Sequence, residues 1–193
     1  MSVHGSVSVD HQEKLRNFDL VVLAHLQSAF GLARWYVRNE DDAKDLVQEA
    51  MLRAFKAFDT FRGENGRVWL LTIVRNLYFS SVSRKQPDQT VFNEEIHLFR
   101  ESFQNPEVLM LRSLDSQLIR QGIEQLPEEF REVLVLREME DLAYKEIAEV
   151  VKVPIGTVMS RLARAREQLR QNLLPHMTRS TGQKKQGRNT AAK

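Results

Sequence analysis

Two short amphipathic segments near the C-terminus, separated by Lys152-Val153-Pro154, constrain the fold of this chain more than any other feature. The second segment repeats apolar residues at steps of three and four, which predicts a helix with one buried stripe. Ile155, Val158, Leu162, Ala165 and Leu169 form that stripe. Pro154 favours a helix start because its missing N–H would have no intrahelical partner there. This is the pattern of a helix-turn-helix.

The opposite side of the second segment carries the donors that DNA recognition needs. Arginine donates two hydrogen bonds to a guanine edge, and hydroxyl groups bond to phosphates. The candidate DNA-binding residues are Thr157, Ser160, Arg161 and Arg164. The alternative is a solvated basic face on an ordinary helical hairpin. The proline, the spacing and the charge together favour the DNA-binding helix.

Charge is segregated along the chain, although 28 basic and 26 acidic residues leave a net charge of only +2. From Ala143 to Lys193 there are 11 Lys or Arg and three Glu, a local charge of +8. From Gln86 to Leu142 there are five Arg and 13 Asp or Glu, a local charge of −8. Residues 60–85 form a second basic patch. Such segregation suits a chain that lays one part along phosphates and keeps another part away from them.

Composition narrows the class of protein further. A length of 193 residues, 42% of them hydrophobic, suits two small globular domains. The absence of cysteine excludes disulfides and thiolate metal sites and suits a reducing cytoplasm. No apolar run reaches membrane-spanning length, so we expect a cytoplasmic protein without membrane insertion. No paired histidine ligands, nucleotide-binding loop or cysteine nucleophile occurs, so we expect no catalytic residue, no metal and no cofactor.

Helical periodicity extends over most of the remaining sequence. It predicts helices over about 18–37, 43–58, 67–84 and 111–123, and another that opens at Pro127. Asn39 is placed to cap the second of these helices. We therefore predict an all-α fold with two small helical domains joined by a flexible linker, the C-terminal one containing the helix-turn-helix. The predicted divisions are domain 15–85, acidic linker 86–110, domain 111–175 and disordered basic tail 176–193.

Four motifs occur in order along these segments. They are Asp42-Ala43-Lys44-Asp45-Leu46-Val47-Gln48-Glu49 with Phe55 and Phe58, then Trp69-Leu70-Leu71 through Arg75-Asn76-Leu77, then Leu126-Pro127, and finally Pro154-Ile155-Gly156-Thr157-Val158 with Ser160-Arg161 and Arg164-Ala165-Arg166. In this combination the chain resembles the extracytoplasmic-function (ECF) group of bacterial RNA polymerase sigma factors over about residues 15–175.

The resemblance implies a promoter-specificity factor that binds core RNA polymerase and directs initiation in a stress or envelope response. It implies an N-terminal domain that melts the minus-ten element and a C-terminal domain that reads the minus-thirty-five element. Relatives are commonly held by an anti-sigma factor, so we expect three partners: core polymerase, promoter DNA and an anti-sigma factor.

For core polymerase, the resemblance points to the polar side of the second helix. The candidate residues are Asp42, Asp45, Gln48, Glu49 and Lys56. A solvated face is the alternative. A metal site formed by Asp41, Asp45 and Glu49 fits poorly, because no histidine stands beside them and such sites draw ligands from several facing helices.

For the minus-ten element, the resemblance points to the glycine-containing turn between Phe61 and Arg67 and to the following helix. The candidate residues are Arg62, Asn65, Arg67, Arg75 and Asn76. Such a turn lets its backbone approach an unstacked base closely. Tyr78 and Phe79 are able to stack on bases, but aromatic residues in helices more often pack in a core or an interface.

The chain departs from the family pattern in three places. Where family members commonly carry acidic and basic residues, this chain has Ser80, Ser81 and Ser83. Lys152 replaces the usual glycine of the turn, and Met159 replaces a polar base-contacting residue. The competing hypothesis is a stand-alone helix-turn-helix regulator that binds its operator as a dimer. Such a regulator would carry a receiver or ligand domain with strands, and the N-terminal half has no β pattern.

Overall fold

The computed structural model describes residues 4–37, 39–63, 65–85 and 116–186. These residues contain helices and no strand, which confirms the all-α prediction. The expected linker 86–110 and the first residues of the expected second domain lie outside the described residues. Within the described ranges, no helix combines the length and the apolar character that crossing a membrane requires.

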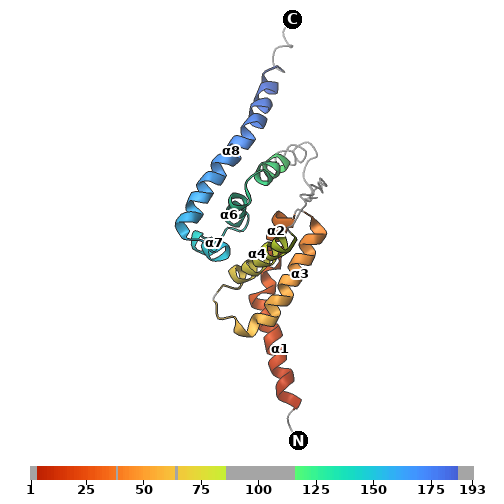
Figure 1. The fold of residues 1–193 in the computed structure, drawn as a ribbon. Helices are drawn as coiled ribbons and strands as arrows, with labels where there is room; N and C mark the ends of the chain where they lie inside the picture. Colours follow the sequence, from red (N-terminus) through yellow and green to blue (C-terminus); the bar gives the residue numbers. More distant parts are fainter. Residues whose placement is uncertain (1–3, 38, 64, 86–115, 187–193) are drawn as a thin grey trace. The chain divides into compact units, whose positions relative to one another are not determined.

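Figure 1 shows the order of the helices. The N-terminal half contains α1 (His4–Val21), the short 3-10 helix η1 (Leu23–His25), α2 (Leu26–Val37), α3 (Glu40–Ala57), the 3-10 helix η2 (Phe58–Thr60) and α4 (Gly66–Lys85). The C-terminal half contains a helical segment over residues 116–124, then α6 (Glu128–Glu138), α7 (Tyr144–Val151) and α8 (Ile155–Gln186).

Helices α2, α3 and α4 pack against one another in pairs. Asn39 caps α3 as predicted, because its side-chain oxygen accepts a hydrogen bond from the Asp41 N–H at 2.9 Å. The buried side of α3 consists of small residues, which let neighbouring helices approach closely: Ala43, Val47, Ala50 and Ala54. The single helix predicted over 18–37 is instead interrupted by η1, and α1 extends back to His4.

The chain divides into two compact units, and their limits differ from the predicted domains. The first unit comprises Met1–Glu95 and Val135–Ile155, and the second comprises Ile96–Leu134 and Gly156–Lys193. In the first unit α7 packs against α4. The apolar face of α7 explains this arrangement, since Ile147 and Val150 are fully buried. Residues 135–155 thus belong to the same compact unit as α1 to α4.

The second unit is held together around α8. Asn172 donates a hydrogen bond from its side chain to the backbone oxygen of Gly122 at 3.1 Å. A Cβ at Gly122 would lie 2.9 Å from a terminal methyl of Leu169, so the Leu169 side chain would have to shift to make room for it. Ile123, Leu126, Val133 and Leu134 are buried in this unit.

The predicted apolar stripe of α8 is only partly correct. Val158, Leu162 and Ala165 are buried, whereas Ile155 is 49% exposed. Ile155 is the first residue of α8, and helical side chains point back toward the N-terminus, where no preceding turn exists to cover it. At its other end α8 continues to Gln186, past residue 175 where a disordered tail was expected to begin.

Candidate nucleic-acid interface

The N-terminal half of α8 presents two of the four predicted DNA-binding residues openly. Ser160 and Arg164 are exposed, and Arg164 forms no ion pair with any described residue. Thr157 is half-buried, and its backbone oxygen accepts a hydrogen bond from the Ser160 hydroxyl at 3.0 Å. Arg161 lies 2.7 Å from Glu129 in an ion pair, with 21% of its side chain exposed. Arg164 is therefore the freer of the two guanidinium groups.

Other residues of α8 near this face are also exposed. Met159 is 53% exposed beside Ser160. Farther along α8, Arg170 donates two hydrogen bonds to Glu167, at 3.0 and 2.8 Å. These bonds, with one from Gln171, lower the pKa of the Glu167 carboxyl to about 2. The guanidinium of Arg170 is thus already paired.

The turn before α8 contains the left-handed residue that the helix-turn-helix needs. Lys152 ends α7 with φ 55° and ψ 47°. Its backbone N–H bonds to the oxygen of Ala148, and so does the Val153 N–H at 3.3 Å. The position usually filled by glycine therefore keeps its conformation with a lysine, at a steric cost of about 1–2 kcal/mol.

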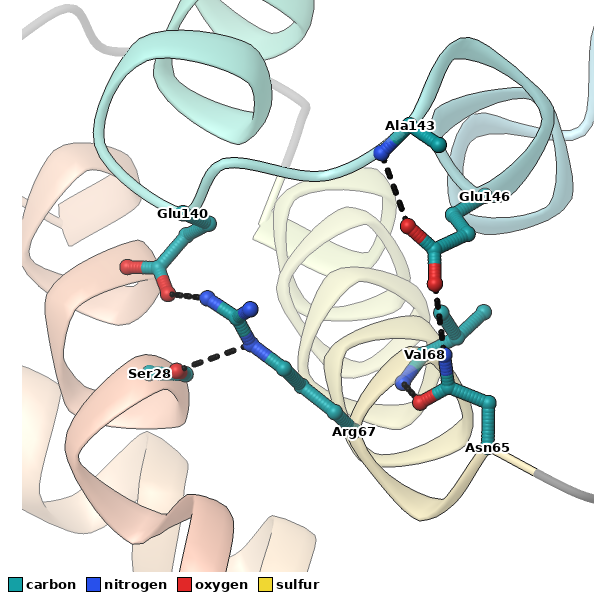
Figure 2. Close-up of polar contacts among 7 residues, drawn as sticks. All are labelled: Ser28, Asn65, Arg67, Val68, Glu140, Ala143 and Glu146. Carbon is teal, nitrogen blue, oxygen red and sulfur yellow. Dashed lines mark hydrogen bonds and ion pairs between the residues drawn. The ribbon is translucent and has the colours of Figure 1, made fainter.

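Asn65 and Arg67, two of the predicted minus-ten residues, lie at the start of α4 (Figure 2). The Asn65 side-chain oxygen accepts a hydrogen bond from the Val68 N–H at 3.1 Å, which caps α4. The Asn65 amide nitrogen donates to Glu146 Oε1 at 2.6 Å. Glu146 Oε2 accepts a bond from the Ala143 N–H at 2.7 Å, so it also caps α7.

The Arg67 guanidinium is held from two directions (Figure 2). Its Nη2 donates to Glu140 Oε2 at 2.6 Å, and its Nε donates to the Ser28 hydroxyl at 3.1 Å. Burial and then the positive charge of Arg67 lower the pKa of His25 below its ordinary 6.5. His25 is therefore neutral at pH 7 and adds no second cation beside Arg67. The partners Ser28, Glu140 and Glu146 were not found from the sequence, since no local pattern relates them to residues 65–67.

The other three predicted minus-ten residues are placed separately. Arg62 is exposed, and its guanidinium donates to the backbone oxygens of Asp59 at 2.7 Å and Phe61 at 3.2 Å. Asn76 is exposed and lines a shallow groove on the C-terminal half of α4 with Phe79, Ser80, Ser83 and Arg84. Arg75 lies 4.6 Å from the centre of the Phe79 ring.

Two aromatic residues near the C-terminal end of α4 pack against α2. Tyr78 stacks on Tyr36 with ring centres 4.6 Å apart, and Phe79 meets Tyr36 edge-on at 5.9 Å. Tyr78 and Phe79 are both half-buried. They brace the helix beside the groove, as expected of aromatic residues in helices.

The predicted polymerase-binding residues share an exposed side of α3. Asp42, Asp45, Gln48, Glu49 and Lys56 are all exposed. Glu49 accepts a bond from Arg53 at 2.7 Å. Leu52, which is 50% exposed, was missed, although its spacing from Asp45, Glu49 and Lys56 puts it on the same face. In the part of the chain that the structure describes, no cluster of three potential metal ligands occurs.

Comparison with known proteins shows the family to which the chain is related. Residues 21–87 match the family model for Sigma-70 region 2, and residues 116–169 match that for Sigma-70, region 4. The RNA polymerase sigma-H factor of Pseudomonas aeruginosa is 37% identical over 169 residues, covering 83% of this chain and 88% of that relative. The ECF RNA polymerase sigma-E factor of Escherichia coli K12 is 36% identical over 171 residues, covering 84% of this chain and 89% of that relative.

The chain is an ECF sigma factor. It belongs to a group of promoter-specificity factors that bind core RNA polymerase and direct transcription initiation, and these are non-catalytic regulators. The hypothesis of a stand-alone regulator is not favoured. Among solved structures, the sigma factor RpoE of Bartonella quintana, in complex with the anti-sigma factor NepR, matches with a TM-score of 0.69 and 28% identity. That match covers 82% of this chain and 97% of the other.

Proposed function

We propose that this sigma factor uses three described surfaces. The exposed side of α3 binds core polymerase, the start and outer side of α4 bind the minus-ten element, and the N-terminal half of α8 binds the minus-thirty-five element. The observation that carries the proposal is that most of the polar residues at the motif positions of both matched regions are exposed, whereas Arg67, Arg75, Thr157 and Arg161 are half-buried.

On α3 the proposal rests on charge and on one apolar side chain. Asp45 and Glu49 offer carboxylates to a basic partner, while Leu52 offers apolar area at the same face. Asp42, Gln48 and Lys56 extend the polar part of this surface. The hydrogen bonds that the Lys44 ammonium donates to Asp41 and then to Glu40 raise the pKa of Lys44, so Lys44 is held by its own helix.

On α4 the proposed contacts are Arg62, Asn65, Arg67, Arg75 and Asn76. Asn76 is exposed beside an open groove, so a base edge can reach its amide. The amide can bind a base because it both donates and accepts hydrogen bonds. On α8 the proposed contacts are Thr157, Ser160, Arg161 and Arg164. Arg164 is expected to read a base, whereas Arg161 must first leave Glu129.

The functional divisions proposed are residues 15–85 for polymerase and minus-ten binding and 111–175 for minus-thirty-five binding, joined by linker 86–110 and followed by tail 176–193. The relative from Bartonella quintana was solved with an anti-sigma factor, and this supports an anti-sigma partner here. We further propose that the chain acts in the cytoplasm, where polymerase and chromosome meet. It needs neither metal nor cofactor, has no enzymatic activity of its own and serves a stress or envelope response.

Reconstituted transcription tests the proposal. Purified chain and core polymerase are mixed with the DNA upstream of the chain's own gene, and start-site opening is mapped with permanganate. We expect a transcript and a bubble. Asn76→Ala should leave polymerase binding unchanged and reduce the reactivity of the bubble by about fivefold or more, because a base contact is worth about 1–3 kcal/mol.

Ser116→Ala is the matched control, since Ser116 is exposed in the second unit and has no proposed role. A normal bubble with Asn76→Ala would contradict the minus-ten assignment. Failure of the wild-type chain to direct any transcript from this or other upstream fragments would contradict the proposed use of these surfaces as a whole.

A further inference from the structure

Met159 and Arg164 lie at the two edges of the exposed face in the N-terminal half of α8. Both are exposed, and both belong to the second compact unit and to the stretch that matches region 4. Because they are five residues apart, their side chains point about 140° apart around the helix axis. Arg164 has a proposed contact with DNA. Met159, which is 53% exposed, has none.

Small residues occupy the middle of this face, between the two long side chains. They are all exposed, and they are Gly156, Ser160 and Ala163. The Ser160 hydroxyl donates to the backbone oxygen of Thr157 at 3.0 Å, so it lies close against the helix. A face that is low in the middle and has one long side chain at each edge lets another molecule come close to the helix. The long side chains then reach that molecule from both sides.

Gly156 gives a second and independent indication that a partner approaches this face. A Cβ added to Gly156 would have no atom of the described residues within 4 Å, so the packing of the chain itself does not require a glycine there. Glycine is also a poorer helix former than alanine. A helical glycine with open space above it is expected where another molecule comes close to the backbone.

Charge shows where this face ends and which partner it fits. The Arg164 guanidinium forms no ion pair with any described residue, so its donors are available to acceptors on a partner. Glu167, less than one turn farther along α8, is exposed, and its carboxylate would repel phosphates. The part of α8 that fits DNA is therefore the part from Gly156 to Arg164, which contains Met159.

The major groove of DNA offers one apolar group to such a face. Base edges there present hydrogen-bond donors and acceptors, and thymine alone also presents a C5 methyl group. The Met159 side chain has no donor and only a weak acceptor, so it cannot bind a base edge as an arginine or an amide does. It is apolar and flexible, and it therefore adapts to an apolar contact. Its chemistry matches the thymine methyl group.

We infer that Met159 is a specificity-determining residue, which packs against the C5 methyl group of a thymine in the minus-thirty-five element. This inference rests on the proposed minus-thirty-five role of α8 and adds a base preference to it. Met159 and Arg164 are about 7.5 Å apart along the helix axis, which corresponds to about two base-pair steps of 3.4 Å. The element should therefore contain a T·A pair within about two base pairs of the guanine that Arg164 binds.

The first test removes the methyl group and nothing else. The full chain in complex with core polymerase is titrated against promoter duplex from the chain's own upstream DNA, and each thymine of the minus-thirty-five element is replaced in turn by deoxyuridine. The wild type should bind about fourfold more weakly when one particular thymine is replaced, because one methyl group leaves an apolar contact. Met159→Ala should bind the unmodified duplex at least as weakly and lose nothing more on the modified one.

Met139→Ala is the matched control, because it removes the same atoms from a methionine that is 50% exposed and lies outside α8. It should bind as the wild type does and keep the sensitivity to the methyl group. A methyl effect that persists in Met159→Ala, or one that disappears in Met139→Ala, would overturn the inference.

The remaining outcomes separate this inference from the proposed function. If no deoxyuridine weakens binding while Arg164→Ala still does, the role of Met159 is overturned and the minus-thirty-five assignment stands. If the wild type binds cognate and scrambled elements equally, both are overturned.

A second test changes the base preference instead of removing it. Promoter duplexes with a randomised minus-thirty-five element are selected for binding to the complex of chain and core polymerase. The wild type should enrich a T·A pair at the position that the deoxyuridine series identifies. Met159→Arg should enrich a G·C pair there, because arginine donates two hydrogen bonds to guanine, and the pair that Arg164 binds should not change. No enrichment of T·A by the wild type, or continued enrichment of T·A by Met159→Arg, would overturn the inference.

Discussion

Arg161 and Arg164 are near neighbours on α8, yet their surroundings differ. Arg161 is held 2.7 Å from Glu129, whereas Arg164 is exposed and has no ion-pair partner among the described residues. A guanidinium that is already paired must break that contact before it binds a base. A free one loses only side-chain freedom. The local environment therefore shows that Arg164 is more available for DNA binding than Arg161, whereas the sequence alone did not distinguish them.

Arg164→Ala should lower affinity for a cognate minus-thirty-five duplex by about tenfold or more, because a bidentate base contact is worth about 1–3 kcal/mol. Binding to scrambled duplex should fall less. Arg161→Ala, the comparison variant, should have the smaller effect on cognate DNA. Anisotropy titrations of the full chain at fixed salt measure these affinities. Equal losses on cognate and scrambled DNA would make Arg164 a phosphate contact instead.

Lys152 is a second residue whose surroundings predict a measurable effect. It adopts the left-handed conformation, which is unfavourable for a side chain with a Cβ. Lys152→Gly should raise the free energy of unfolding by about 0.5–1 kcal/mol, since relief of this strain exceeds the entropy that glycine adds to the unfolded chain. Thermal unfolding measures the difference. Lys145→Gly, inside α7, should instead destabilise by a similar amount, and a stabilising Lys145→Gly would contradict this account.

The two sides of helix α3 have different roles: one side packs in the core, and the other faces outward. Small residues such as Ala50 and Ala54 are fully buried, while Asp45, Glu49 and Leu52 face outward. Because a helix repeats every 3.6 residues, substitutions on the outer side leave the buried side intact. The surface proposed to bind polymerase is therefore open to mutation without unfolding the chain.

Asp45→Lys with Glu49→Lys should weaken association with core polymerase at least tenfold while leaving the far-ultraviolet circular dichroism spectrum unchanged. Two attractive charges become repulsive, and loss of the Glu49–Arg53 pair costs the helix no more than about 0.5 kcal/mol. Glu13→Lys with Asp19→Lys is the matched control on α1, with the same change of charge at exposed positions. Undiminished binding of the α3 variant in a pull-down would contradict the proposal that this side of α3 binds polymerase.

Hydrophobic periodicity and capping residues predicted the helices, because both signals depend on residues close together in the sequence. The start of α3 follows from Asn39 and the acidic first turn, and the buried Val158, Leu162 and Ala165 follow from their spacing. The pairing of Arg67 with Glu140, and of Arg161 with Glu129, did not follow. These contacts join residues far apart in sequence, and a helical pattern identifies a face without identifying what meets it. The exposure of Ile155 was missed for a related reason, since periodicity does not show that a helix begins there.

For the molecule as a whole, charge acts over longer distances than any one contact. The stretch from Ala143 to Lys193 carries +8, and its last part, residues 178–193, contains five cations and no large apolar residue. Cations without an apolar anchor attract phosphates but do not fix a register on the bases. The end of the chain should therefore add affinity for any DNA and contribute nothing to promoter choice.

Truncation after Met177 tests this division between affinity and specificity. It removes Arg179, Lys184, Lys185, Arg188 and Lys193. The slope of log K against log salt should become shallower by up to about 4.5, since each neutralised phosphate contributes about 0.9. The ranking of promoters in reconstituted transcription should not change. Full-length chain with Lys184→Gln and Lys185→Gln is the control, and it should show part of the change in slope with the same ranking. A reordered ranking after truncation would mean that the tail itself reads sequence.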